Sequence, residues 1–561
     1  MIEYLVIAGA GLLLIAAATM LSPRVGIATP LLLVGAGVAA SYLPIFHDFH
    51  LNPELILQGV LPPLLYAAAV AMPAMSFRRE FGAISGLSVL LVVASSLVLG
   101  LFFMLVIPSV GFAWGVALGA VISPTDAVAT SIIKKTSVSK RVVAILEGES
   151  LLNDASALVL LRTAIVATAA SFSFWGAVGS FSYSVVVALL IGIAVGTGNL
   201  LLRRRLHDPA VNTVISFTVP FLGAIPAELL EASGLVAAVV AGLITGFRQP
   251  RMLPPRNRLS DRENWRTIEL VLEGAIFLTM GLQIRTIVED VQRDHEGVLH
   301  AVLLAAIALL ITVAIRAAYV APLLAWLGRR SNRIAKIQPK VADLQEKIST
   351  PEGKSKVADR MAQRSGREPT EAHLERFSTR LRRSLADFEY FLRAPLGWRE
   401  GAVVVWAGMR GAVTVAAAQT LPSDTPNRSV LILIAYTVAL LSLVVQGGTI
   451  GPLLGVLSRN PDEAELAAER ELEEADRRRL HEIMREAYKS VPVVEIPEDT
   501  PRDEQFELRK KYRNAIIDAQ RAALLDARED GIFDADVLKD ELTGLDADQI
   551  ALSMRGPASH L

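Results

Sequence analysis

The sequence has no cysteine, few histidines and, over most of its length, few charges. The absence of cysteine from its 561 residues excludes a disulfide scaffold and any thiolate metal ligand or nucleophile. The eight histidines are scattered, and no pair has a zinc-binding spacing. We therefore expect neither a metal centre of that kind nor a small secreted domain.

Charge is scarce in most of the chain because it is concentrated in two segments. Residues 329–399 hold 17 basic and 9 acidic residues, whereas residues 456–561 hold 16 and 26. The formal net charge of −1 thus conceals a basic segment of +8 and an acidic segment of −10. The other 384 residues carry 43 charges, roughly half the density of a soluble domain. Most of this protein does not face water.

Apolar runs of the length that a bilayer core requires divide the weakly charged part into thirteen expected membrane spans. The first run lacks the charged n-region of a secretory signal, so it is interpreted as a span as well. The expected limits are 2–21, 26–43, 54–74, 84–107, 112–133, 141–169, 175–202, 210–227, 231–247, 266–284, 298–327, 399–420 and 429–455.

Lysine and arginine, which concentrate in cytoplasmic loops, test this count. Sixteen follow the odd-numbered spans up to the ninth, and only three lie in the alternate loops. This alternation places the N-terminus outside and the C-terminus in the cytoplasm.

Four segments are expected in total. Spans one to eleven occupy 1–328, a basic cytoplasmic loop 329–398, the last two spans 399–455, and an acidic helical cytoplasmic tail 456–561. Helical periodicity is visible at 463–488 and 506–528 of the tail. The opposite charges of loop and tail also suggest contact between them, the alternative being two solvated segments.

Away from the span ends, nine charged residues fall inside the expected spans, where each costs about 3 kcal/mol or more and indicates a functional site. They are Asp126, Glu147, Glu149, Asp154, Arg162, Glu269, Glu273, Arg316 and Arg410. Asp126, Asp154, Glu273 and Arg410 lie near the centres of their spans. Arg162 is close enough to a span end to reach the interface. For Arg316, ion pairing and a role in transport are both open.

Two spans are interrupted near their centres. Ser123-Pro124-Thr125-Asp126 breaks one, and Gly408-Met409-Arg410-Gly411 breaks another in the second half. Unpaired backbone at membrane depth is tolerated only where it is buried in protein or lines a cavity. Such a pair of interrupted segments points to a secondary transporter built from inverted repeats, with its site at the midplane.

A polar run between these interruptions offers ligands for a hard cation. In Glu147-Gly-Glu149-Ser150-Leu-Leu-Asn153-Asp154, helical spacing puts Ser150 and Asp154 on one face, and Glu149 with Asn153 beside it. A buried carboxylate favours its neutral form, so Asp154 is expected to hold either a proton or a cation. The alternative is a polar cluster that only holds helices together.

These residues also carry a resemblance. Gly148-Glu-Ser-Leu-Leu-Asn153-Asp154, the preceding Ser-Pro-Thr-Asp126 and the later Arg410-Gly-Ala together resemble the cation:proton antiporter-1 family of NhaP and NHE sodium/proton exchangers. The resemblance implies an all-α membrane fold in which two broken helices cross, an elevator-like movement and a homodimer in a bacterial plasma membrane. It also implies electroneutral exchange, because Asn153 stands where electrogenic relatives have an aspartate. Neither a cofactor nor an enzymatic reaction is expected.

The same resemblance assigns roles to residues. Na⁺ is expected at Asp154, Ser150 and Thr125, Asn153 at the crossing, Asp126 on the ion path, and Glu149 in an ion pair with Arg410. Glu273 and Arg316 are further candidates.

Three alternatives stay open. Potassium could replace sodium, because an acid that many members carry after the proline pair is absent after Pro62-Pro63. An intramembrane aspartyl protease could use Asp126 and Asp154, and an ion sensor could signal through the tail without transport. Nucleic acid is not an expected partner.

Overall fold

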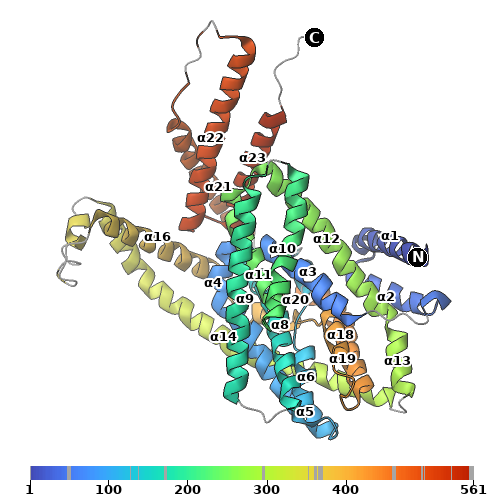
Figure 1. Ribbon diagram of the computed structural model, residues 1–561. Helices are drawn as coiled ribbons and strands as arrows, with labels where there is room; N and C mark the ends of the chain where they lie inside the picture. Colours follow the sequence, from blue (N-terminus) through green and yellow to red (C-terminus); the bar gives the residue numbers. More distant parts are fainter. Residues whose placement is uncertain are drawn as a thin grey trace. The chain divides into compact units, whose positions relative to one another are not determined.

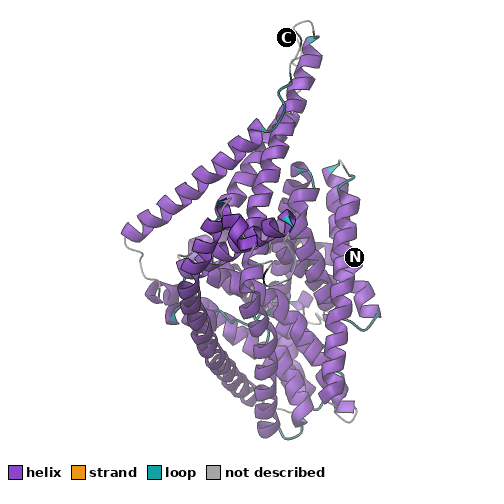
Figure 2. Cartoon of the chain, turned by 90° about the vertical axis from the view of Figure 1, so that its left-hand side faces the viewer, coloured by secondary structure: helices purple, strands orange, loops and turns teal. Residues whose placement is uncertain are grey.

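The computed structural model describes residues 2–554 with short gaps, and every regular element in this described part is a helix (Figure 1; Figure 2). The residues not described are 1, 47–51, 127, 135, 137, 170–173, 207, 294–296, 351–352, 359–362, 364–369, 458–462, 495–496, 498–499, 532 and 555–561. The expected tail therefore ends outside the described residues, and residues 458–462 near its start lie outside them as well.

The chain forms two compact units. We call the first, made of Met1–Met252, Leu259–Leu324 and Trp398–Ser458, the transmembrane unit. The second, made of Leu253–Arg258, Ala325–Gly397 and Arg459–Leu561, is the tail unit.

The transmembrane unit contains most of the helices, and three of them are extended by π-helical turns. Its elements are α1 (Ile2–Val25), α2 (Thr29–Ser41), η1 (Pro44–Phe46), η2 (Leu55–Val60), α3 (Leu61–Ala71), α4 (Ala74–Ser85), η3 (Gly86–Leu91), α5 (Val92–Val106), α6 (Gly111–Ile122), α7 (Val128–Ile133), α8 (Lys140–Ala169), α9 (Phe174–Arg203), α10 (Pro209–Leu229), α11 (Gly234–Met252), α12 (Pro255–Leu282), α13 (Ile284–Arg293), α14 (Val298–Ser349), α17 (Trp398–Trp406), α18 (Ala412–Gln419), α19 (Arg428–Ser442), η4 (Leu443–Gly447) and α20 (Gly448–Leu457). Helices α12 and α14 also extend into the tail unit.

By length and composition, eight helical stretches of the described residues can cross a membrane, and three further apolar helices are shorter. The expected multi-pass membrane architecture is thereby confirmed. Thirteen crossings, their direction and the inverted repeat stay predictions.

Both expected interruptions are present. Helix α6 ends at Ile122 and α7 begins at Val128, with Pro124 in the non-helical stretch that follows α6. Helix α17 ends at Trp406, and α18 begins at Ala412 after a glycine-containing segment. Proline removes a backbone donor and glycine lacks a Cβ, so both segments leave the helical conformation at these points.

Small residues let α5 and α6 approach closely. A Cβ placed on Gly115 would lie 2.5 Å from the carbonyl oxygen of Gly100, and one on Gly119 would lie 2.6 Å from that of Ser96. Close approach of this kind is how helices pack in a membrane, where water provides no hydrophobic driving force between them. The packing fixes the position of the interrupted α6–α7 segment.

The tail unit is a helical module with its own core. Its helices are α16 (Glu371–Arg393), α21 (Glu463–Lys489), α22 (Arg502–Asp530) and α23 (Ala535–Met554). Leu480, Leu524 and Leu538 are buried in the cluster that joins α21, α22 and α23. The periodicity of the tail therefore predicted α21 and α22 correctly.

The tail unit also joins the basic loop to the acidic tail. Helix α16 packs against α22, and Arg383 Nε lies 3.6 Å from Asp530 Oδ1. The segment Leu253–Arg258, which includes the first turn of α12, belongs to the same unit, and Arg258 donates two hydrogen bonds of 2.5 and 2.7 Å to Asp546 of α23. Arg521 of α22 donates to the same carboxylate at 3.1 Å.

Candidate ion-binding site

Asp154 lies in the middle of α8 with its side chain buried. The residue is 7% exposed and interacts electrostatically with Asp126. Among the described residues, no lysine or arginine forms an ion pair with it. Ser150 precedes it by one turn and therefore projects from the same face of α8. The structure thus brings together the two aspartates that the sequence analysis selected.

The two interrupted segments meet beside this face. The backbone amide of Asp126 donates a 2.7 Å hydrogen bond to the carbonyl oxygen of Met409. The Asp126 carboxylate rests against Gly411 so closely that a Cβ at this position would overlap it. A residue other than glycine would displace Asp126, so the glycine is required for this close approach.

Asn153 connects α8 to the first interruption. Its side-chain amide donates to the backbone carbonyl of Thr125 at 3.0 Å and to the Thr125 hydroxyl at 2.7 Å. The hydroxyl of Thr125 in turn donates to Glu149 Oε1 at 3.1 Å. Asn153 therefore satisfies a carbonyl that the interruption of α6 would otherwise leave unpaired in a buried place.

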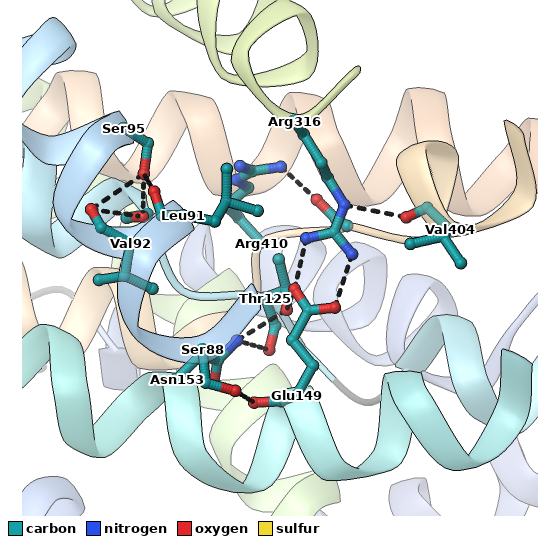
Figure 3. A network of polar contacts seen from close by, with 12 residues as sticks. Ser88, Leu91, Val92, Ser95, Thr125, Glu149, Asn153, Arg316, Val404 and Arg410 are labelled. Atoms are coloured by element: carbon teal, nitrogen blue, oxygen red, sulfur yellow. Dashed lines mark hydrogen bonds and ion pairs between the residues drawn. The ribbon is translucent and has the colours of Figure 1, made fainter. Parts of the chain in front are cut away.

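Arg316 of α14, rather than Arg410, pairs with Glu149. Its guanidinium donates to both carboxylate oxygens, at 2.7 Å in the NH2 bond, and both side chains are 2% exposed (Figure 3). Nε of Arg316 also donates to the carbonyl oxygen of Val404 in α17, at 2.9 Å. The expected Glu149–Arg410 pair is therefore wrong, and Arg316 has the ion-pairing role that the sequence left open.

Arg410 serves the ends of the interrupted helices instead. It donates to the carbonyl oxygen of Ile122, the last residue of α6, at 3.2 Å, and to the carbonyl oxygen of Gly408 in the segment after α17. Carbonyl groups at helix C-termini carry partial negative charge, and a guanidinium stabilises them. Arg410 therefore does not need Glu149 as a partner. The position of a residue within an apolar span does not reveal these carbonyl acceptors, which is why the sequence predicted the wrong pair.

Two π-helical turns flank the network. Ser88 of η3 donates to the carbonyl oxygen of Glu149 at 3.2 Å. On the other side, Ser442, adjacent to η4, accepts a 2.9 Å hydrogen bond from the backbone amide of Arg410. Such turns are frequent at functional sites, and no feature of the sequence marked them in advance.

A second group of charges lies along α7, α8 and α12. Glu273 of α12 is within electrostatic reach of Asp126 and of Glu269 one turn earlier. Glu269 interacts in turn with Glu147 of α8, and Glu147 forms an ion pair with Lys134. Lys134 is one of the sixteen basic residues that served only to orient the expected spans, so the sequence did not predict this contact.

The arrangement offers carboxylate, hydroxyl and carbonyl oxygens in a buried place. Asp154 and Ser150 supply two of these from α8, and the interruption at Thr125 and Asp126 supplies the others. Hard monovalent cations prefer oxygen ligands of this kind. No thiolate or imidazole is present among these residues, so the donor set fits an alkali cation and not zinc.

Comparisons with known proteins agree with this reading. Residues 10–338 and 378–456 match the family model described as sodium/hydrogen exchanger, transmembrane. An uncharacterized Na⁺/H⁺ exchanger of Mycobacterium tuberculosis is 27% identical over 464 residues, which cover 81% of this chain and 74% of the relative. A sodium, potassium, lithium and rubidium/H⁺ antiporter of Bacillus subtilis is 31% identical over 277 residues, 48% of this chain and 41% of the relative.

The fold is similar to that of a solved antiporter. The sodium proton antiporter MjNhaP1 from Methanocaldococcus jannaschii superposes with a TM-score of 0.55 at 14% identity, covering 81% of this chain and 99% of that one. Because the family model spans well over half of the sequence, the chain belongs to the sodium/hydrogen exchanger family of membrane transporters.

Proposed function

We propose that this protein is a secondary active antiporter that exchanges one monovalent cation, sodium in the first place, for one proton at Asp154. The observation that carries the proposal is the buried Asp154 carboxylate, which interacts electrostatically with Asp126, the residue through which the two interrupted segments meet. A lone carboxylate in a low-dielectric place costs free energy unless a proton or a cation neutralises it. Asp154 therefore binds one or the other.

Competition for one carboxylate is sufficient for exchange. If only the neutralised site crosses between the two sides, each cycle carries a cation one way and a proton the other. The site has the same net charge in both loaded states, so exchange is electroneutral. The Glu149–Arg316 pair and Arg410 hold the helices around the site.

Alternating access supplies the movement. We propose thirteen crossings with the N-terminus outside and the C-terminus in the cytoplasm, and an elevator-like displacement of the helices that carry the site. The interruptions at α6–α7 and α17–α18 support the paired repeats of such transporters. Their hydrogen bond between Asp126 and Met409 makes them move together.

Potassium exchange at the same site is the second candidate. It is favoured by the Bacillus subtilis relative, whose name includes potassium, and by the apolar Leu64 and Leu65 after the Pro62-Pro63 pair. Fewer carboxylates around a site discriminate less strongly between alkali cations of different size.

We further propose a homodimer in a bacterial plasma membrane that serves pH homeostasis. Large apolar side chains are exposed on the membrane helices, among them Leu13 of α1 and Trp175 of α9 at 75% and 78%. Lipid or a second copy covers such surfaces.

The test uses everted membrane vesicles acidified by respiration, in which a fluorescent probe reports the pH difference. Addition of Na⁺ to parent vesicles is expected to dissipate the gradient, and comparison with K⁺ and Li⁺ establishes selectivity. Asp154→Asn is expected to abolish exchange, whereas Asp424→Asn, in the exposed turn between α18 and α19, provides a matched control.

Exchange that survives in Asp154→Asn would contradict the proposed mechanism. A parent that dissipates no gradient with any of the three cations would favour a non-transporting sensor, and retained exchange with K⁺ alone would favour the second candidate.

A further inference from the structure

The inference concerns Lys134, and it rests on the proposed function. Lys134 directly follows α7, and its backbone amide donates a 2.9 Å hydrogen bond to the carbonyl oxygen of Thr130. Ile133 before it is fully buried. The other end of α7 begins beside Asp126, whose Oδ1 accepts a 3.4 Å hydrogen bond from the amide of Val128. Lys134 and Asp126 therefore sit at opposite ends of one short helix.

The ammonium group of Lys134 contacts the carboxylate of Glu147 on α8. Glu147 precedes Asp154 by seven residues, which is 20° short of two full turns of an α-helix and about 10 Å along its axis. Both carboxylates therefore project from the same face of α8, one near the surface and one buried. The side chain of Glu147 is 21% exposed, whereas Asp154 as a whole residue is 7% exposed.

Helix α12 supplies a second row opposite this face. Glu269 and Glu273 are one turn apart and so share a side of the helix. Glu269 is within electrostatic reach of Lys134, Glu147 and Arg266, and Glu273 is within reach of Asp126. Carboxylates thus follow one another from Lys134 to Asp154, and the cations at the outer end of the series are Lys134 and Arg266.

Lys134 is suited to compete with a cation at this place. Its ammonium group is a compact monovalent charge on a flexible stem. Half of its side chain remains exposed, at 54%, so the group can leave Glu147 without crossing an apolar barrier. A cation moving toward Asp154 past Glu147 meets a carboxylate that is already neutralised.

We propose that Lys134 is a tethered cation that occupies the entrance to Asp154 and competes there with the transported ion for Glu147. Lys134 does not contact the transported ion at Asp154. It therefore affects the KM for the cation and has little effect on the maximal rate of exchange. Because Lys134 lies in a connection proposed to be cytoplasmic, the effect is confined to cations arriving from that side.

The test compares the KM for Na⁺ of parent and Lys134→Gln in everted vesicles, whose outer surface is the cytoplasmic face. We expect Lys134→Gln to lower KM by on the order of threefold or more, with kcat changed less than about twofold. Lys134→Arg keeps the charge and is expected to retain the parent KM. Lys135→Gln removes the same charge from the adjacent residue and controls for a general change in surface potential.

Glu147→Gln identifies the partner. It is expected to raise KM, and Lys134→Gln is expected to have no further effect in that background. With right-side-out vesicles, in which Na⁺ reaches the other face, parent and Lys134→Gln should have the same KM. Sodium-dependent thermal stabilisation of the purified protein provides a readout without transport, and its midpoint should shift to lower Na⁺ in Lys134→Gln.

Several results would overturn the inference while leaving the antiporter proposal intact. They are an active parent whose KM is unchanged in Lys134→Gln, an equal decrease in Lys135→Gln, or an undiminished effect of Lys134→Gln in the Glu147→Gln background. Failure of the antiporter proposal has a different signature, because a parent without exchange, or an active Asp154→Asn, contradicts that proposal directly.

Discussion

Asn153 and Thr125 are joined by two hydrogen bonds from one side-chain amide, so the residue before Asp154 holds the interruption of α6 in place. The hydroxyl of Thr125 donates a hydrogen bond to Glu149, which in turn forms an ion pair with Arg316 of α14. The carboxylate proposed to bind the ion is therefore adjacent to the residue that positions the broken helix. A substitution at Asn153 is therefore expected to affect stability and transport together.

Asn153→Ala is expected to weaken both properties. The substitution leaves the buried carbonyl of Thr125 without a donor, which costs about 1–3 kcal/mol of unfolding free energy. The melting temperature of the detergent-solubilised protein should fall, and exchange should decrease with it. Thr125→Ser, which keeps the hydroxyl, is the control. A variant with parental melting temperature and exchange rate would contradict the role given to Asn153.

Arg316 is expected to be coupled to Glu149 more strongly than Arg410 is, and Arg316→Gln is expected to destabilise the protein. Removing one partner of a buried ion pair leaves an uncompensated charge and costs about 3–5 kcal/mol. In double-mutant cycles with Glu149→Gln, the melting temperatures should reveal a large coupling for Arg316 and a small one for Arg410. Equal couplings would restore the pair expected from the sequence.

Gly411→Ala is expected to abolish exchange. The added Cβ overlaps the Asp126 carboxylate, so either that side chain or the segment after α17 must move. The matched control is Gly448→Ala, where nothing lies within 4 Å of the new atom. Vesicle exchange measured for both variants at equal expression gives the comparison. Normal exchange in Gly411→Ala would show that the close approach is dispensable.

Asp546→Asn is expected to loosen the tail unit. The side chain of Arg258 is 12% exposed and loses its charged partner, while Arg521 loses part of its own. Limited proteolysis of the full-length protein should cut between α22 and α23 faster, because cleavage follows the population of the opened state. Asp548→Asn, an exposed acid two residues away, should leave the rate unchanged. Equal rates in both variants would remove Asp546 from this role.

Electroneutral exchange predicts no dependence on membrane potential. In proteoliposomes with a fixed pH difference, a potential imposed with a lipophilic ion should leave the initial rate of Na⁺ uptake unchanged, since each cycle moves no net charge. The same measurement on Asn153→Asp, which adds a carboxylate next to Asp154, tests whether the charge of this position sets the stoichiometry. A rate that follows the potential in the parent protein contradicts one-for-one exchange.

The sequence predicted the two interruptions better than it predicted the partners of the charged residues. Pro124 and Gly408 marked both interruptions because proline and glycine act locally, and helical spacing placed Ser150 and Asp154 together. The partner of Glu149 could not be read in this way. Arg316 and Arg410 both lie inside expected spans, and the choice between them depends on which carbonyl groups the broken helices leave exposed.

Helix ends show a second limit of the same kind. Hydropathy placed a span at 266–284, whereas α12 begins at Pro255, and it ended another at 327, whereas α14 continues to Ser349. Apolar length measures the thickness of the bilayer and not the length of a helix. Polar residues with high helix propensity extend both helices beyond the apolar stretch.

The path of the chain between its two units has a consequence for any experiment that shortens the protein. The chain passes from one unit to the other at residues 252/253, 258/259, 324/325, 397/398 and 458/459, so the tail unit is anchored at five points. Deleting everything after Ser458 removes only one of these anchors. It leaves Arg258 in the first turn of α12 without its partner Asp546, and α16 without α22, the helix on which it packs. Truncation therefore exposes surfaces of the remaining chain that the tail helices cover. The activity of the truncated protein reflects this exposure together with the loss of the tail.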